Sequence, residues 1–212
     1  MDVRIIQTGL GAERITAKLQ DVCVEPPNAI VVAGTAAGIN QDYLPGDIVI
    51  YSKVINHSGQ LLDLTPGLTE RLRAALVETQ PKLGVGYTSS KAVTTFGEKA
   101  ALRTRFQADC IDMETAAVVE FANQRAIPIA AVRVIVDPFD QAIPIAAIAG
   151  LNQDGSTNAR GTIGALIKGP RQIFELLKIA RQYSCAMKSL ARAARLLVRN
   201  LASNAVSHSA TN

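Results

Sequence analysis

The chain of 212 residues is 48% hydrophobic and only 4% aromatic, with no Trp, which fits one α/β domain built mainly from aliphatic side chains. Three Cys at long spacings and two His exclude a disulfide framework and a zinc knuckle; without an apolar run of membrane length or a signal peptide, the chain is expected in the cytoplasm. The net charge of +4 is unevenly spread, because residues 1–167 hold 14 Lys and Arg against 17 Asp and Glu, whereas residues 168–212 hold 8 against one.

Apolar residues follow strand and helix periods in turn along most of the chain. In chain order, the pattern first predicts a strand over residues 3–8, a helix over 12–19 and strands over 29–33 and 47–55. A helix over 68–78, a strand over 82–88 and a helix with outward charges over 98–106 follow. The last predicted elements of this pattern are an extended segment over 109–113, a helix over 114–125 and a strand over 127–136. Because strands and helices alternate, we expect a single-domain, three-layer α/β/α fold over residues 1–201, with a mixed, largely parallel central sheet.

Residues 170–201 have the period of a basic amphipathic helix. One face is apolar and holds Ile173, Leu176, Ala180, Tyr183, Met187, Leu190, Ala194, Leu197 and Leu201. Another face is basic and holds Lys178, Arg181, Lys188, Arg192, Arg195 and Arg199. Packing on the body with a solvated basic side is the more common outcome of such a pattern, and attraction to an anionic membrane surface is the alternative. Residues 202–212 are expected to fray.

Two glycine-containing turns follow predicted strands. Residues 34–38, GTAAG, offer backbone N–H groups and the Thr35 hydroxyl to an anion or a polar ligand, although such a turn is as often only a tight connection. Residues 9–11, which include Gly9, are followed by Arg14 and form half of a dinucleotide fingerprint, but the third Gly and the acidic residue are absent, which excludes an NAD site. Cys110 has no base nearby in the sequence, so we interpret it as a buried structural residue.

Two carboxylates mark the ends of successive predicted strands. Glu114, in IDMETAA, starts the helix over residues 114–125, and Asp137, in DPFD, ends the strand over 127–136. In a parallel βαβ unit, both would lie at the carboxyl edge of the sheet, where α/β proteins bind ligands. The alternative is that Glu114 only stabilises a helix N-terminus and that Asp137 caps a turn.

Two longer segments carry a family resemblance. Residues 29–54, with AGTAAGINQDYLPGDIVI, and residues 109–140, with DMETAAVVEFANQRAIPIAAVRVIVDPFD, resemble the two signatures of the purine nucleoside phosphorylase and methylthioadenosine/adenosylhomocysteine nucleosidase superfamily. Residues 150–182 further resemble the hopanoid-associated phosphorylases, which remove adenine from a nucleoside joined to a triterpene chain. The chain begins at what corresponds to the family's second strand, and Val32 stands where some phosphorylases have Arg.

The resemblance implies a role for individual residues. Met113 would pack under the ribose, Glu114 would accept hydrogen bonds from its 2′- and 3′-hydroxyls, and Asp137 would protonate or hydrogen-bond the purine at N7. The other implied positions are Gly34 and Thr35 for phosphate or the nucleophile, and Val93, Thr94 and Arg133 for the base. Where this sequence departs from the family, Arg14 after the turn at Gly9 would compensate as a phosphate ligand from a helix N-terminus.

The activity implied by the resemblance is that of a pentosyltransferase. It would cleave the N-glycosidic bond of an adenine ribosyl compound with phosphate as co-substrate and without metal or cofactor, and the branch suggests adenosylhopane in hopanoid biosynthesis as substrate. A hydrolytic nucleosidase and a non-catalytic nucleoside-binding relative remain as alternatives. Many relatives are oligomers, so we expect a homo-oligomer, either free in the cytoplasm or peripheral to the inner membrane through the basic helix. Nucleic acid is not an expected partner, because that helix lacks interleaved aromatic residues beyond Tyr183 and the body of the chain is acidic.

Overall fold

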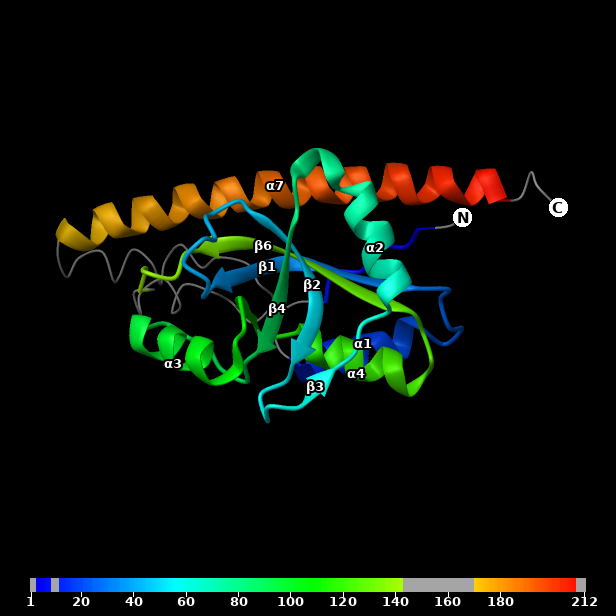
Figure 1. Cartoon of the computed structure of the whole chain (residues 1–212), viewed down its shortest axis with the longest axis horizontal. Coiled ribbons are helices and arrows are strands. Elements are labelled where there is room, and N and C mark those ends of the chain that lie inside the picture. The colour runs from blue at the N-terminus through cyan, green and yellow to red at the C-terminus, as the bar shows by residue number, and fades with distance from the viewer. Residues whose placement is uncertain (1–2, 9–11, 143–169, 209–212) are drawn as a thin grey trace.

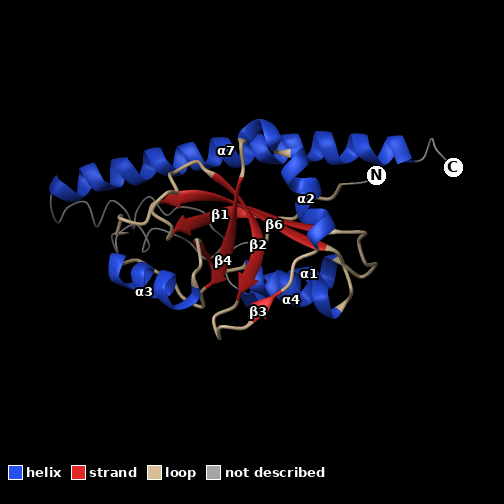
Figure 2. Cartoon of the chain, viewed as in Figure 1, coloured by secondary structure: helices blue, strands red, loops and turns tan. Residues whose placement is uncertain are grey.

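The computed structural model describes residues 3–8, 12–142 and 170–208. In this part of the chain a sheet lies between helices, as Figure 1 and Figure 2 show. The strands are β1 (Ile30–Gly38), β2 (Ile48–Ile55), β3 (Leu61–Leu62), β4 (Lys82–Thr88), β5 (Cys110–Asp112) and β6 (Ile129–Asp137). The helices are α1 (Ala12–Val22), α2 (Pro66–Ala75), α3 (Phe96–Phe106), α4 (Thr115–Gln124) and α7 (Pro170–His208), with a 3-10 turn, η1 (Val77–Thr79). The predicted α/β class is confirmed.

The described strands are ordered β3-β2-β4-β5-β1-β6, and a further pairing between β2 and β6 closes β2, β4, β5, β1 and β6 into a ring. The two longest ladders, β1–β6 and β2–β4, are parallel, as is β4–β5. The pairings β1–β5, β2–β3 and β2–β6 are antiparallel. The prediction of a mixed, largely parallel sheet is therefore confirmed.

The unit β5-α4-β6 differs from the parallel βαβ unit that the sequence suggested. β1 lies between β5 and β6, and it is antiparallel to β5 and parallel to β6, so β5 and β6 run in opposite directions. The aliphatic residues at the start of β1 form a ladder with β6 that extends from Ile30 to Ala37, whereas β5 has only three residues. The longer ladder takes the place beside β6, since each added pair contributes hydrogen bonds and side-chain contacts.

The strand predicted over residues 3–8 does not form. This segment has no ladder partners, and its contact with the body includes a hydrogen bond from Arg4 Nη1 to the carbonyl of Val22 at 3.3 Å. Val3 and Ile5 remain 47% and 83% exposed. β1 pairs with β6 along most of its length and with β5 only at Ala37 and Gly38, and residues 3–8 take part in neither ladder.

Helices cover both faces of the sheet. α1 and α4 pack on one face, around side chains such as Tyr51, Phe121 and Ile135. α2 and α7 pack on the other, over Ile50, Val132 and Val134. Successive side chains of β6 point to opposite faces of the sheet, so this strand contributes to both hydrophobic clusters. Each buried Val or Ile stabilises the fold by about 1.5–3 kcal/mol relative to an exposed one. A third cluster lies toward α3, and its members are Ile39, Tyr87, Val93, Ala108, Ile111 and Phe139.

α7 is one helix that reaches His208, so residues 202–208, which were expected to fray, have a helical backbone. Its packing stripe is rotated from the predicted face. Tyr183 and Met187, expected to be buried, are 47% and 39% exposed. The stripe that faces the core contains Ala186, Ala193, Leu196 and Leu197. The two alanines carry short side chains, which allow the helix axis to approach the sheet closely.

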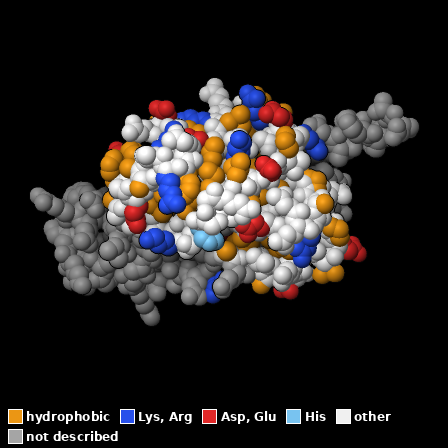
Figure 3. All heavy atoms as spheres, turned by 60° about the horizontal axis from the view of Figure 1, so that its bottom comes forward, with side chains coloured by type: hydrophobic (Ala, Val, Ile, Leu, Met, Phe, Trp, Pro, Cys, Tyr) orange, Lys and Arg blue, Asp and Glu red, His pale blue; other side chains and the backbone are white. Residues whose placement is uncertain are grey.

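One face of the molecule carries charges of both signs. On the face turned forward in Figure 3, Lys and Arg side chains are interspersed with Asp and Glu and with hydrophobic groups. None of the helices in the described part of the chain combines the length and apolar character that crossing a membrane requires.

Candidate active site

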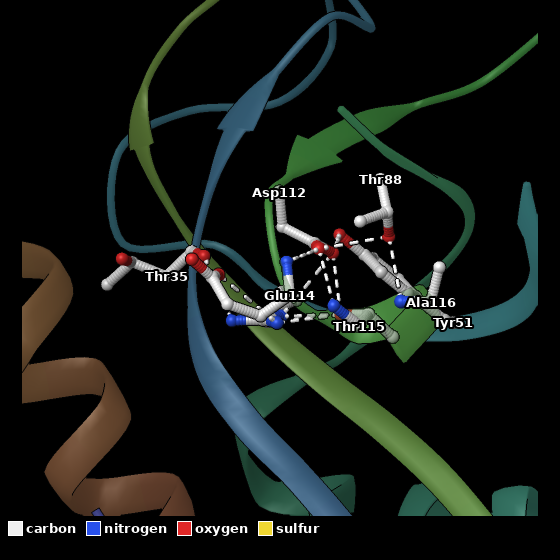
Figure 4. Close-up of polar contacts among 8 residues, drawn as sticks. Thr35, Tyr51, Thr88, Asp112, Glu114, Thr115 and Ala116 are labelled. Atoms are coloured by element: carbon white, nitrogen blue, oxygen red, sulfur yellow. Dashed lines mark hydrogen bonds and ion pairs between the residues drawn. The ribbon is translucent and has the colours of Figure 1, made fainter. Parts of the chain in front are cut away.

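An enclosed carboxylate at the end of β5 organises the start of α4. Asp112 Oδ1 accepts hydrogen bonds from the Thr88 hydroxyl at 3.1 Å and from the backbone N–H groups of Glu114 and Thr115 at 2.9 and 2.8 Å. Its Oδ2 accepts from the Tyr51 hydroxyl at 3.1 Å and from the Thr115 hydroxyl at 2.6 Å, and Figure 4 shows these side chains converging. Asp112 thus satisfies N–H groups that have no partner within the helix, and it fixes where α4 begins.

Arg133, a residue of β6, forms an ion pair with the Asp112 carboxylate. Its Nε lies 3.6 Å from Asp112 Oδ2, and its Nη2 lies 3.8 Å from Glu114 Oε2. It also donates to the Thr115 hydroxyl from Nε and Nη2, at 3.1 and 2.7 Å, and from Nη1 to the carbonyl of Thr35 at 3.3 Å. Burial by itself lowers the pKa of Arg133, but the negative charges around it, led by Asp112, raise the pKa above its ordinary value. The guanidinium is therefore charged and pairs with the Glu114 carboxylate.

The GTAAG segment belongs to the sheet instead of forming the predicted loop. β1 continues through it to Gly38, with Gly34 opposite Arg133 and Thr35 opposite Val134 of β6. A Cβ at Gly34 would collide with the Arg133 guanidinium, so the glycine allows the side chain to cross the strand. Its role here is a close approach within the sheet, and the Thr35 carbonyl is used by Arg133.

Glu114 and Met113 lie between this network and the surface. Glu114 precedes the first helical residue of α4 without capping it through its side chain, and its side chain is only 14% exposed. Met113 is partly buried beside it. Because the backbone N–H of Glu114 donates to Asp112 and its carboxylate faces Arg133, both ends of the residue are held. A carboxylate oriented in this way is suited to accept hydrogen bonds from a ligand.

Asp137 ends β6 in a second buried ion pair. Lys99 Nζ lies 2.6 Å from Asp137 Oδ2 and also donates to the carbonyls of Pro138 and Gln141, at 2.7 and 3.0 Å. Lys99 is completely buried, although the charges of its helix were predicted to point outward. Burial raises the pKa of Asp137 above its ordinary value, and the attraction of Lys99 offsets only part of that shift.

The two carboxylate sites lie on either side of β1. Ala37 pairs with Asp137 of β6 on one side and with Ile111 of β5 on the other. The Cα atoms of these two partners are therefore two strand spacings apart, about 10 Å. The register of the β1–β6 ladder shifts by one residue between Ala36 and Ala37, so Val136 of β6 has no partner in β1. Glu114 follows Ile111 by three residues and is paired with Arg133, whereas Asp137 is paired with Lys99.

The other candidate residues are distributed unevenly around this region. Val93 is buried in the third cluster with Phe139, on the Asp137 side, and the backbone N–H of Thr94 donates to Glu98 Oε2 at 3.2 Å. Arg14 lies exposed in the first turn of α1, and Gly9 falls outside the described residues. Over residues 3–8, 12–142 and 170–208, no group of three or more His, Cys, Asp or Glu side chains could hold a metal ion.

Sequence reasoning missed Asp112 and Lys99. The signal for Asp112 was local, since an acidic residue three positions before a helical N–H is a capping arrangement. No local signal identifies Lys99, because its burial depends on the distant chain segment after β6. Cys110 is fully buried, as predicted, and burial raises the pKa of its thiol well above the ordinary value.

Comparisons with known proteins agree with this architecture. A family model described as the phosphorylase superfamily matches residues 1–168. The fold is similar to 5′-methylthioadenosine/S-adenosyl homocysteine nucleosidase of Campylobacter jejuni, with a TM-score of 0.59 and 18% identity over 74% of this chain and 75% of that one. It is also similar to the same enzyme of Helicobacter pylori in complex with a ligand (TM-score 0.62, 14% identity, 89% and 77% covered) and to futalosine hydrolase of Helicobacter pylori (0.57, 15%, 87% and 76%). At these identities, the likeness concerns the fold.

Proposed function

Because the chain belongs to the phosphorylase superfamily, we propose that it cleaves the N-glycosidic bond of an adenine ribosyl compound with phosphate as co-substrate. The observation that carries the proposal is the pair of held carboxylates flanking β1, with Glu114 over Arg133 and Asp137 against Lys99. Because the two carboxylates have different ion-pair partners, they suit different roles, Glu114 at the sugar and Asp137 at the purine of a nucleoside.

The chemistry follows from where charge develops. As the bond between C1′ and N9 breaks, its electron pair goes to the purine, positive charge builds on the ribosyl ring, and a phosphate oxygen forms a bond to C1′. Asp137 gives its proton to N7, which neutralises the leaving purine. The raised pKa of Asp137 keeps more of this acid protonated than an ordinary Asp at the same pH.

Glu114 and Met113 take the sugar in this proposal. The ionised Glu114 accepts hydrogen bonds from the 2′- and 3′-hydroxyls and favours the positive charge of the ring, while Met113 packs under the ribose. Val93 and Thr94 border the base. Arg133 is assigned to orienting Glu114 in place of the predicted contact with the base, because all its recorded polar contacts run to Thr115, Thr35, Asp112 and Glu114.

The nucleophile site is proposed around Gly34 and Thr35, with Gly9 and Arg14 as further phosphate ligands. Hydrolysis is the second candidate, because the solved structures named above are of nucleosidases and a hydrolase. For the substrate, adenosylhopane in hopanoid biosynthesis is proposed from the resemblance of residues 150–182, most of which lie outside the described residues.

The test is adenine release from adenosine and from 5′-methylthioadenosine, with and without phosphate, followed by chromatography. Phosphate-dependent release together with ribose 1-phosphate is expected; phosphate-independent release would favour hydrolysis. Asp137→Asn should lower the rate by roughly 10²–10⁴. Asp47→Asn, which alters a partly exposed ion pair with Lys82, is the matched control. Nucleoside binding without release in any condition would identify a non-catalytic binder.

We also propose that α7 brings the enzyme to an anionic membrane surface from the cytoplasm. Its exposed apolar strip includes Leu177, Tyr183, Met187 and Val198, which lie beside the packing stripe. Lys188 and Arg195 flank the strip, and together with Tyr183, Ser184, Met187 and Ala191 they line a shallow hollow. An apolar strip beside a basic row is the pattern of helices that lie in a membrane interface.

Vesicle sedimentation tests this partner. The chain should sediment with vesicles containing phosphatidylglycerol, less with neutral phosphatidylcholine vesicles, and less at high salt because screening weakens the charge attraction. Met187→Glu should reduce binding, and Glu70→Gln on α2 is a control away from the strip. Equal binding to both vesicle types would argue against the proposal. The proposed homo-oligomer is checked by sedimentation velocity, where α7 variants that alter the mass would point to contact between copies.

A further inference from the structure

Lys99 is a buried lysine that the roles above do not use. It lies on α3 with an exposed fraction of 0%, far from the solvated position that a lysine in a helix usually takes. Burial of an ammonium group is costly unless charge and hydrogen bonds compensate for the lost hydration. Its retention between α3 and the end of β6 therefore needs an explanation.

The geometry around Nζ satisfies an ammonium group completely. A lysine ammonium has three N–H donors, and Nζ has three acceptors within reach: Asp137 Oδ2 at 2.6 Å, the Pro138 carbonyl at 2.7 Å and the Gln141 carbonyl at 3.0 Å. One carbonyl belongs to the residue directly after Asp137, and the other to the residue four positions after it. Lys99 therefore fixes the backbone after β6 and the carboxylate at its end in one geometry.

Several neighbours of Asp137 in the fold are apolar, and a backbone N–H also donates to its carboxylate. Ala37 of β1 is its register partner, Ile111 of β5 lies one strand further, and Phe139 is buried in the cluster beneath α3. The neighbouring acid on α3, Glu98, is engaged with Thr95 and lies 3.9 Å from Lys91 in the opposite direction. Lys99 is thus the charged side chain that faces Asp137 among the described residues.

We propose that Lys99 is a positioning residue of the reaction, which orients the Asp137 carboxyl group and stabilises the carboxylate left after Asp137 has protonated the purine. The inference rests on the proposed function. In the step, the C1′–N9 electron pair passes to the purine, the proton moves from Asp137 to N7, and the new negative charge on Asp137 is held by Lys99, which keeps its own proton.

The direction of the pKa shifts agrees with this role. Burial raises the pKa of Asp137, and the charge of Lys99 and its hydrogen bond lower it again. Without Lys99, the acid would be protonated over a wider pH range but would give up its proton less readily. Lys99 therefore limits how far burial raises the pKa of Asp137 and makes its proton easier to transfer.

The experiment measures adenine release across pH 5–10 from adenosine, or from 5′-methylthioadenosine if that is the compound cleaved, with inorganic phosphate present. The proteins are the wild type, Lys99→Met, Lys99→Arg, Asp137→Asn and the double variant. Lys99→Met should lower kcat by roughly 10- to 100-fold, part of the 10²–10⁴ that a general acid contributes, and should move the basic limb of the kcat/KM profile to higher pH. Lys99→Arg should keep that limb close to its wild-type position, since the positive charge remains.

The double variant separates positioning from simple structural support. If Lys99 acts through Asp137, the double variant is no slower than Asp137→Asn, because the two changes remove one shared function. It also removes both buried charges, so it tests the proposal even if Lys99→Met fails to fold. Lys82→Met, which breaks another Lys–Asp pair at 2.7 Å, should leave the pH limb unchanged.

The outcomes distinguish the two proposals. No adenine release by the wild type would overturn the proposed function and the role of Lys99 with it. Wild-type release with an unshifted basic limb in Lys99→Met, or with rate losses that multiply in the double variant, would overturn the role of Lys99 alone.

Discussion

Replacing Asp112 by Asn tests whether the enclosed carboxylate organises the site. The side chain of Asp112 is fully buried, and the amide keeps its size but not its charge. The NH2 group would face donors that now bind Oδ2, namely the Tyr51 and Thr115 hydroxyls, and the Arg133 guanidinium 3.6 Å away. The hydroxyls can turn and accept, but the guanidinium cannot.

The magnitude follows from the loss of one partner of a buried pair. Such a change costs about 3–5 kcal/mol, and the lower end applies because Glu114 still lies 3.8 Å from Arg133. In a chain of this size, a loss of about 3 kcal/mol lowers Tm by roughly 6–12 °C. Thermal unfolding followed by circular dichroism measures the shift.

The control is Asp47→Asn, because the Asp47–Lys82 pair is 28% and 37% exposed and contributes about 1 kcal/mol or less. If Asp112→Asn melts within about 2 °C of the wild type, which corresponds to less than roughly 1 kcal/mol, the carboxylate is not the organising group inferred here.

Three further predictions concern Asp137, Gly34 and Cys110. Since burial raises the pKa of Asp137, the protonated acid persists above the ordinary pKa of about 3.9, and kcat/KM should fall only as pH rises through the raised value; a basic limb near pH 4 would contradict this. Gly34→Ala places a methyl group against Arg133 and should lower the free energy of unfolding in urea by about 1–3 kcal/mol. Gly97→Ala, where a Cβ meets nothing within 4 Å, should be neutral or stabilising; equal effects would refute the crowding argument. Cys110 should resist a thiol reagent until the chain unfolds, while the exposed cysteine of α7 reacts at once; fast modification of both would show that the strand is not closed.

The local sequence was sufficient to predict a helix or strand where the hydrophobic period and the length of the segment indicated the same element. The alternating and β-branched residues of β6, and the apolar periods of α2 and α4, predicted those elements to within a few residues. The same patterns predicted the α/β class and the mixed sheet, because each element must bury one face against another.

Predictions from the local sequence failed where contacts with distant segments determined the structure. GTAAG has the composition of a turn, yet its small residues pair with β6 and make room for Arg133. Tyr183 and Met187 have the period of a packed face, but Ala186 and Ala193 let an adjacent face of α7 approach the sheet. These packing arrangements depend on residues far away in the chain, and the hydrophobic period of a single segment gives no information about them.

The sequence alone determined which residue types are available to the site: an Asp-Met-Glu segment at the end of one strand and an Asp-Pro at the end of another. Only the tertiary structure decided their partners. β1 separates the two strands, and Glu114 faces Arg133 while Asp137, at the end of β6, meets Lys99. A buried charge is tolerated only where distant segments supply a counter-charge and hydrogen bonds, and that arrangement exists only in the folded chain.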